Sequence, residues 1–346
     1  MRSRYTAHES DLSEHQELVS SLWADHLDGM TAPAARTKLR HAYLANPAGP
    51  GSCLLLHDEA SHRSVGVQCL HARTFWHGTA AHRAAALADY VVVPAHRSLG
   101  PALTLMRAGL TAAWQGLDFV YGFPNRQSEA VCVRAGMRRI GGTTRYGKLL
   151  RARFLLRAHP QRRWLAPLAR PLDALLHLID AARALRHARG LRWSDATADD
   201  PRIEAVWQQR DPGLLLSERS ARVLAWRYAP EGFPGWRVSV AEDAQGRPLG
   251  YVAWACRDDV VLVSDFFCSR PAQDTCRLLS GFVRHVCRQP ASAVSLEFHG
   301  SPEIASQLRR AGFLARPGVA PLYLAGAQAS VDASAWYVTG FDRDGD

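Results

Sequence analysis

Apolar positions are most regularly spaced between residues 86 and 141, where they predict alternating strands and helices. Residues 86–94 read ALADYVVVP, a β-branched run that ends in proline, as expected of a strand leaving a sheet. The next apolar side chains recur at steps of three and four, which predicts a helix: Leu99, Leu103, Met106, Leu110 and Trp114. Residues 117–121 predict a short buried strand, and a second helix is expected from Asn125, a good N-cap, to Gly136.

The turn between the first strand and the first helix has the composition of an anion site. Residues 97–102 read RSLGPA, so small residues stand where a backbone must approach a ligand, and Pro101 suits a first helical turn. The free N–H groups of such a turn and the positive end of the helix dipole favour a pyrophosphate. An ordinary strand, turn and helix without a ligand is the alternative interpretation.

These residues resemble the GNAT superfamily of acyl-CoA-dependent N-acyltransferases. The acyl-CoA loop of that superfamily has the form Arg/Gln-x-x-Gly-x-Gly/Ala, which Arg97, Gly100 and Ala102 fit. Its second signature, an Asn that opens a helix ending in Gly, is similar to Asn125 and Gly136. The six-residue loop alone is a weak signal, so the resemblance depends on the agreement of both signatures in this order.

The resemblance implies an acyl-CoA, expected as acetyl-CoA, that binds as the donor substrate. Backbone N–H groups of the loop would hold its pyrophosphate, and the strand at residues 90–93 would pair with its pantetheine. The cofactor-binding residues implied are Val91, Val93, Arg97, Ser98, Leu99, Gly100, Ala102, Asn125 and Ser128. No metal is expected.

One position departs from the superfamily pattern. Seven residues after Asn125, where many members carry a tyrosine that protonates the leaving thiolate, this chain has Cys132. A lone cysteine on an apolar helix face is most often a buried structural residue. The proton would then come from Tyr121, from Tyr146 or from solvent, and the sequence does not choose among them.

Two carboxylates of the first half are candidates for the general base. Acyl transfer to an amine requires removal of a proton, stabilisation of an oxyanion and protonation of the thiolate. The catalytic candidates are Asp89 on the loop strand, Glu129 on the second helix, and Tyr121 as the acid, with backbone amides at residues 91–93 for the oxyanion. Each side chain could instead be an ordinary sheet or helix-terminal residue.

Three residues of the second half are expected to contact the acceptor. Asp265, Glu297 and His299 stand at the ends of predicted strands, although a turn or sheet role would explain each of them as well. Asp342 looks like part of a frayed acidic tail, or alternatively like a group that helps to hold a polar acceptor.

The element order of the first half recurs in the second, which predicts a duplicated domain. The fold class predicted is α/β, with an α+β mixed sheet in two tandem GNAT-like domains joined by a basic helical linker. The expected boundaries are residues 1–150, 151–193 and 194–346. Residues 268–274 read CSRPAQD and lack the loop glycine, so only the first domain is expected to bind CoA, while the second shapes the acceptor pocket.

The positive charge is concentrated in the linker. The chain carries a net charge of +10, and residues 151–193 hold ten arginines against two aspartates, a balance of +8. The pattern predicts two helices there, the second opened by Pro171, with an apolar stripe. A linker helix packed on both domains with a solvated arginine face is one interpretation; contact with an acidic membrane surface or with RNA phosphates are the others.

Composition favours a soluble protein of two domains. The chain has 346 residues, 47% of them hydrophobic, and no segment approaches the ~18 unbroken apolar residues of a membrane span. Its polar start is unlike a secretory signal, which predicts a cytoplasmic protein, with membrane-peripheral placement left open by the basic linker. The seven cysteines form no Cys-x-x-Cys pair, so we expect reduced, mostly buried thiols.

The function expected from the resemblance is acyl-CoA-dependent N-acyl transfer, with acetyl as the expected group, to a small-molecule amine. An amino sugar is one candidate, since the tandem layout resembles GNAT proteins found among surface-polysaccharide biosynthesis enzymes. An aminoacyl-tRNA-dependent, Fem-like transferase is an alternative, but the intact loop argues against a nucleic-acid donor. A non-catalytic CoA-binding protein is the other alternative. The sequence does not indicate an oligomeric state.

Overall fold

The computed structural model describes residues 4–154, 161, 168–197, 199–232, 234–326 and 331–343. The first half runs through a strand, two helices, three strands, a helix, a strand, a helix and a strand. Its elements are β1 (Tyr5–Ser10), α1 (Gln16–His26), α2 (Ala32–Lys38), the π-helical turn η1 (Leu39–Leu44), β2 (Ser52–Asp58), β3 (Arg63–His77), β4 (Ala80–Val92), the 3-10 turn η2 (Pro94–His96), α3 (Leu99–Ala113), β5 (Phe119–Gly122), α4 (Glu129–Arg134) and β6 (Arg138–Leu149).

The second half repeats this order, as the sequence predicts, after the linker helix α6 (Ala169–His187). Its repeated elements are β7 (Arg192–Asp195), α7 (Pro201–Gln208), α8 (Ala221–Arg227), β9 (Arg237–Glu242), β10 (Pro248–Arg257), β11 (Val260–Cys268), α9 (Pro271–Val286), β12 (Ala293–His299), α10 (Pro302–Arg310) and β13 (Leu314–Gly326). The additions are β8 (Leu215–Ser217), β14 (Trp336–Thr339) and two 3-10 turns, η5 (Ala333–Ala335) and η6 (Gly340–Asp342). The predicted mixed α/β architecture with a repeated order of elements is confirmed.

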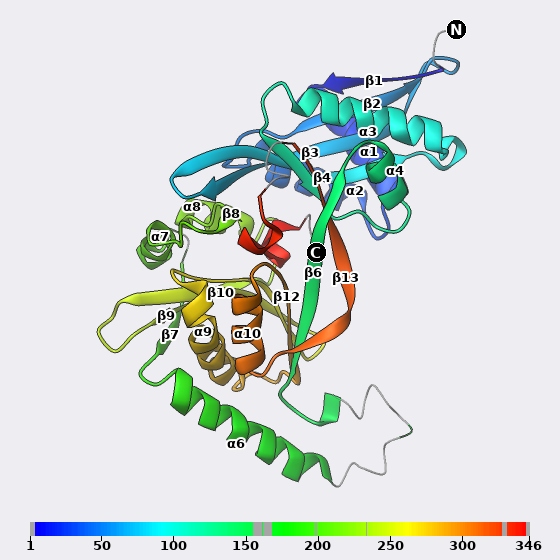
Figure 1. Cartoon of the computed structure of the whole chain (residues 1–346). Coiled ribbons are helices and arrows are strands. Elements are labelled where there is room, and N and C mark those ends of the chain that lie inside the picture. Colours follow the sequence, from blue (N-terminus) through cyan, green and yellow to red (C-terminus); the bar gives the residue numbers. More distant parts are fainter. Residues whose placement is uncertain are drawn as a thin grey trace.

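The two halves exchange their last strands. The sheet runs β1-β2-β3-β4-β5-β13-β6-β12-β11-β10-β9-β7, so β13 of the second half pairs with β5, and β6 of the first half pairs with β12. The two exchanged strands pair with each other at the centre, and Figure 1 shows them running side by side between the halves. Each half therefore completes the sheet of the other.

The C-terminal residues are part of the core and not a frayed tail. Trp336, Tyr337 and Phe341 are completely buried, and so is Asp342. The side chain of Asp342 accepts hydrogen bonds from Ser217 and from the Arg219 guanidinium, which lies 2.8 Å away. The sequence missed this role because nothing local marks an aspartate near a chain end as an ion-pair partner.

The same segment occupies the place in the second half where a ligand groove would open. Strands β11 and β12 pair in parallel only from Val260 to Val263 and then diverge. Beyond that point β14 pairs with the end of β12, and the Tyr337 hydroxyl donates to the carbonyl of Phe266. The protein's own chain therefore fills this gap in the second half.

The linker helix α6 exposes its apolar stripe. One of the three interpretations of the linker packed this helix on both domains with a solvated arginine face, but Leu172, Leu175 and Ile179 are 45%, 51% and 38% exposed. The first of the two predicted linker helices falls largely on residues 155–160 and 162–167, outside the described part of the chain. In the described ranges no helix has the length and apolarity needed to cross a bilayer.

The seven cysteines all lie in described residues, and none forms a disulfide. Five are buried, Cys287 is intermediate and Cys256 is exposed, as predicted for reduced thiols.

A buried histidine between the halves makes stability depend on pH. His71 on β3 lies between the rings of Tyr43 and Trp226, at centroid distances of 5.2 and 5.8 Å. Burial, helped by the nearby Arg73, holds the pKa of His71 well below its ordinary value. Below about pH 6.5 the unfolded chain therefore takes up a proton that the folded chain does not, so stability falls as the pH falls.

We expect His71→Phe to reduce this pH dependence. In the wild-type protein this one group lowers the free energy of unfolding by up to about 1.4 kcal/mol per pH unit below about pH 6.5. Urea unfolding at several pH values between neutral and mildly acidic should show a shallower slope in the variant. Replacement of the exposed His77 in the same way serves as the control and should leave the slope unchanged. Equal slopes for wild type and His71→Phe would contradict the assignment.

Candidate active site

A wedge opens between two neighbouring strands of the first half. Strands β4 and β5 pair in parallel for only three positions, Ala84–Ala86 with Phe119–Tyr121. Farther along β4, the register with β3 shifts so that Asp89 and Tyr90 together oppose one residue, Gln68, which is a β-bulge. Asp89 has a positive φ of 49°, an unusual backbone conformation for a residue other than glycine. The bulge bends β4 away from β5 and leaves its edge unpaired.

This wedge is the mouth of a cavity of about 950 Å³. Its walls come from β4, the end of α1, the start of α3, the turn after β5 and α4. Seven residues predicted from the sequence as site residues line it: Asp89, Arg97, Ser98, Leu99, Ala102, Asn125 and Ser128. The structure thus brings the two sequence signatures into one site.

The loop before α3 is held in place by two hydrogen bonds to β4. The Arg97 Nε atom donates to the carbonyl of Val92 at 2.8 Å. The Tyr90 hydroxyl donates to the carbonyl of Ala102 at 2.7 Å, and burial raises the pKa of this phenol. Since Arg97 ties down its own loop, it is a positioning residue for the turn.

Only some of the loop amides are free to bind a ligand. The amides of Arg97 and Ser98 donate to the carbonyls of Pro94 and His96 at 3.1 and 2.8 Å. Pro101 has no N–H group. Ala102 makes a longer bond of 3.3 Å to Ser98, and within the described chain no acceptor is recorded for the amides of Leu99 and Gly100. These two N–H groups, at the positive end of a 15-residue helix, form the anion-binding part of the turn.

Gly100 is required neither by backbone conformation nor by packing. Its φ lies outside the left-handed region, and a Cβ atom built on it meets no other atom within 4 Å. The missing side chain therefore leaves open space at the start of α3. This is what a close approach between the backbone and a phosphate requires.

Val92, and not its two neighbours, faces the open side of β4, where its carbonyl already accepts from Arg97 Nε and its N–H group is left for a ligand. The Val93 amide donates to the carbonyl of Val65 at 2.8 Å, on the β3 side. Because backbone groups alternate in direction along a strand, Val91 faces the same side, and Val91 is 2% exposed. Val92 lines the cavity, so the predicted pantetheine contacts at Val91 and Val93 move by one residue.

Asn125 positions the second helix. Its Oδ1 atom accepts hydrogen bonds from the amides of Gln127 and Ser128, both at 3.0 Å. Helix α4 then runs from Glu129 to Arg134, and Gly136, with a φ of 99°, ends the turn that follows it. The helix begins four residues later than predicted, because Asn125 caps a turn that leads into it.

Asp89 is the candidate base that lies at the cavity. Its two carboxylate oxygens accept hydrogen bonds from Lys38 Nζ at 2.6 Å and from the Tyr43 hydroxyl at 2.5 Å. Lys38 and Tyr43 come from the helical region after α1, and no local pattern marks them as partners of the bulge.

The other catalytic candidates lie elsewhere. Glu129 accepts a hydrogen bond from the Tyr323 hydroxyl at 2.8 Å, which ties α4 to the exchanged strand β13. Tyr121 is 1% exposed, its hydroxyl donates to the carbonyl of Asp342 at 3.0 Å, and burial raises its pKa to about 12. Neither side chain is among those that line the cavity. Tyr146, the other tyrosine considered as the acid, belongs to the core of the second half.

Cys132 does line the cavity although it is nearly buried. The thiol is 4% exposed, and burial raises its pKa to about 11. It therefore stays protonated at neutral pH, and its high pKa makes it a poor proton donor to a thiolate.

The three predicted acceptor residues of the second half have different surroundings. Asp265 is completely buried and binds Arg219, Thr339 and Tyr251, so its placement does not support contact with an acceptor. His299 packs closely over Gly141 on β6, away from the cavity lining, and burial lowers its pKa.

Glu297 reaches the cavity only through another residue. It accepts a hydrogen bond from Arg343 at 2.8 Å, and Arg343 lines the cavity. Arg343 also lies over the ring of Phe123, at 5.8 Å from its centroid. The second half thus contributes one side chain, Arg343, to the cavity wall. Its position after η6 gave no signal in the sequence.

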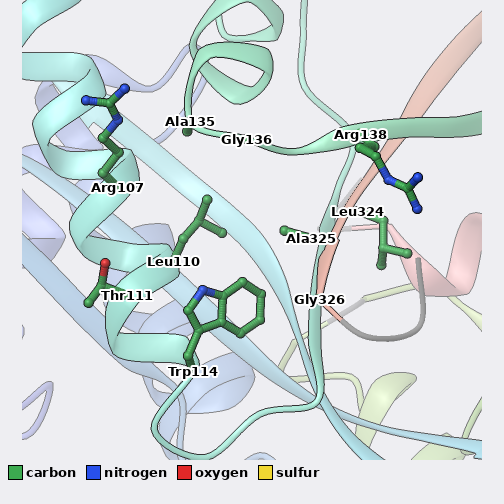
Figure 2. A pocket seen from close by; sticks show the side chains of 10 residues that line it. All are labelled: Arg107, Leu110, Thr111, Trp114, Ala135, Gly136, Arg138, Leu324, Ala325 and Gly326. Carbon is green, nitrogen blue, oxygen red and sulfur yellow. The ribbon is translucent and has the colours of Figure 1, made fainter. Parts of the chain in front are cut away.

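A second hollow of about 600 Å³ lies near the other end of α3. Figure 2 shows the polar ends of Arg107 and Arg138 at its edge, pointing away from one another, while Trp114 lies across its floor. Since its polar groups do not converge, we assign the site to the wedge. Within the described residues, no group of three or more His, Cys, Asp or Glu side chains could hold a metal ion.

Known proteins share this fold. A GCN5-related N-acetyltransferase from Anabaena variabilis is 12% identical with a TM-score of 0.64, over 93% of this chain and 72% of that one. A tandem GNAT protein from the clavulanic acid biosynthesis pathway is 14% identical with a TM-score of 0.50, over 93% and 98%. The N-myristoyltransferase of Saccharomyces cerevisiae, solved with bound myristoyl-CoA, is 10% identical with a TM-score of 0.56, over 94% and 79%.

At these identities the likeness establishes the fold, a tandem GNAT-like architecture, and does not extend to the activity. No protein-family model matches the sequence, and no curated protein matches it.

Proposed function

We propose that the protein is an acyl-CoA-dependent N-acyltransferase whose donor binds in the wedge of the first half. The observation that carries this proposal is the pair of unoccupied amides, Leu99 and Gly100, at the open start of α3 beside the unpaired edge of β4. A diphosphate needs N–H donors and a positive helix end, and an extended pantetheine amide needs a strand edge. The wedge offers both within one cavity.

The donor would lie along the cavity with its diphosphate at the start of α3 and its thioester near Asp89. Its diphosphate would accept hydrogen bonds from the Leu99 and Gly100 amides, with Ala102 beside them. Its pantetheine would run along the edge of β4 at Val92 toward the bulge, where the thioester would meet Asp89. One protein of this fold, the yeast N-myristoyltransferase, was solved with bound myristoyl-CoA, which is a ligand of this class.

The acceptor would be an amine that approaches from the bulge. Asp89 would take the proton as the nitrogen attacks the thioester carbonyl, while Lys38 and Tyr43 hold the carboxylate in position. Since Tyr121 does not line the cavity and Tyr146 lies in the core of the second half, solvent would supply the proton for the leaving thiolate. We keep acetyl as the expected acyl group and an amino sugar of surface-polysaccharide biosynthesis as the first acceptor to test.

The proposal is tested by binding and turnover on the wild-type protein. Thermal unfolding should shift upward with acetyl-CoA or another acyl-CoA, since a ligand that binds only the folded state stabilises it. Release of free CoA thiol from acyl-CoA should then depend on an amine from a panel that includes amino sugars. Binding without amine-dependent release would indicate a non-catalytic CoA-binding protein. Absence of any shift across the acyl-CoA series would reject the donor assignment.

We expect Asp89→Asn to lower kcat about a hundredfold, the lower end of the usual loss when a general base is removed. Asparagine keeps the size of the side chain but cannot accept the proton. The KM for acyl-CoA should change little, and the acidic limb of the pH profile of kcat should disappear. Tyr43→Phe is the matched control: it removes one hydrogen bond to the same carboxylate and should retain most of the activity. A fully active Asp89→Asn protein would show that Asp89 has only a structural role.

A further inference from the structure

Helix α6 turns its apolar side chains outward. This 19-residue helix lies against α9 and forms the outer edge of the molecule in Figure 1. The aliphatic residues on its outer side, with the residue before it, are between 38% and 66% exposed: Leu168, Leu172, Leu175, Leu178, Ile179 and Leu185. Isolated exposed aliphatic residues are common, but five on one helix, together with Leu168 just before it, form a continuous apolar face.

The inward side of the same helix is polar. Asp180 is 6% exposed and accepts a hydrogen bond from Lys148 of β6 at 2.7 Å. One oxygen of Asp173 accepts from the amide of Ala152 at 2.5 Å. A surface helix ordinarily buries its apolar stripe and exposes its charges. On α6 most of the large aliphatic side chains face outward while both aspartates face inward, so the outward face suits an apolar environment.

Exposed arginines flank the apolar face of α6. Arg186 and Arg189 are exposed beside the last leucines, and Arg170 is exposed at the first turn. Each of the two aspartates of the segment is engaged on the inward side, so the outward side carries arginine charge without nearby acid. Apolar side chains bounded by arginines at both ends are the pattern of a helix that lies in the interface of an anionic bilayer.

We propose that α6 docks the protein on an anionic membrane surface, with its axis in the plane of the bilayer. The six aliphatic side chains would enter the region between headgroups and acyl chains, and the three arginines would contact lipid phosphates. Charge favours this occupant over a second copy of the chain, because two copies of a segment of net charge +8 would repel each other. The proposal is independent of the acyl-transfer activity.

Vesicle co-sedimentation of the full chain tests the proposal. The wild-type protein should bind vesicles of phosphatidylcholine with phosphatidylglycerol, bind much less to phosphatidylcholine alone, and be released by salt. The variant with Leu172→Ser, Leu175→Ser and Leu178→Ser should bind at least about tenfold less. The matched control is the variant with Trp114→Ser, Val133→Ser and Leu314→Ser, three exposed apolar residues outside α6, which should bind as wild type does.

A second set of variants tests the contribution of the arginines near the end of α6. Arg186→Glu with Arg189→Glu should also reduce binding about tenfold or more, whereas Arg36→Glu with Arg40→Glu, on exposed positions of the α2 region, should not. Equal binding to neutral and anionic vesicles, or no binding by the wild type, would overturn the proposal even if a variant fails to fold. So would a wild-type dimer that the leucine variant converts to a monomer, because the occupant would then be a second copy.

Discussion

Gly100→Trp is expected to abolish the stabilisation of the protein by acyl-CoA while leaving the fold intact. A Cβ atom added at this position meets no atom within 4 Å, so the new side chain starts into open space. It would, however, occupy the space in front of the two free amides at the start of α3. Each hydrogen bond from an amide to a charged phosphate contributes about 1.5–3 kcal/mol, so the loss of two corresponds to about a thousandfold in affinity.

Thermal unfolding with and without acetyl-CoA measures this effect. The unliganded variant should unfold close to the wild-type temperature, and only the wild type should shift upward with ligand. Thr111→Trp places the same indole on an exposed position near the other end of α3 and should respond to ligand as the wild type does. If Gly100→Trp binds acetyl-CoA normally, the diphosphate does not lie at this turn.

Arg219→Met is expected to destabilise the protein by about 3–5 kcal/mol, since it leaves two buried carboxylates without their cation. Arg219, Asp265 and Asp342 are all completely buried. The guanidinium lies 3.1 Å from Asp265 and 2.8 Å from Asp342, and its Nη1 atom donates to the carbonyl of Ser217 at 2.9 Å. This network joins β8, β11 and the C-terminal turn η6, so its loss should loosen the segment that fills the groove of the second half.

Urea unfolding of the purified variants measures this loss. Arg247→Met is the matched control, because Arg247 pairs with Asp243 at 2.8 Å but its side chain is 77% exposed. An exposed pair contributes at most about 1 kcal/mol, so the control should unfold close to the wild type. If the two variants proved equally stable, the buried network would contribute no more than a surface pair.

Local signals in the sequence predicted the parts of the site that depend on local structure. The helix after the loop begins at Leu99 as its apolar spacing indicates, and the glycine that ends the second helix region has the expected positive φ at Gly136. The duplicated order of elements could also be predicted, because each half carries its own pattern of strands and turns. In the structure Arg97 of the loop and Asn125 of the second signature line the same cavity.

The remaining features depend on contacts between distant residues, which leave no local pattern. Lys38 lies 51 positions before the Asp89 carboxylate that it binds, and Asp342 lies 123 positions after Arg219. The bulge at Asp89 shifts the free strand edge by one residue, which is why Val92 replaces its predicted neighbours. The outward apolar face of α6 was also unpredictable, because periodicity locates a stripe without saying which way it points.

The exchanged strands impose an order on biosynthesis. The open edge of β5 has to wait for residues 314–326, which leave the ribosome long after residues 1–150. At the usual speed of synthesis, about 5–20 residues per second, this delay is roughly 10–35 s. For that interval the backbone groups on one side of β5 have no strand to pair with, so the first half reaches its final form only when translation is nearly complete.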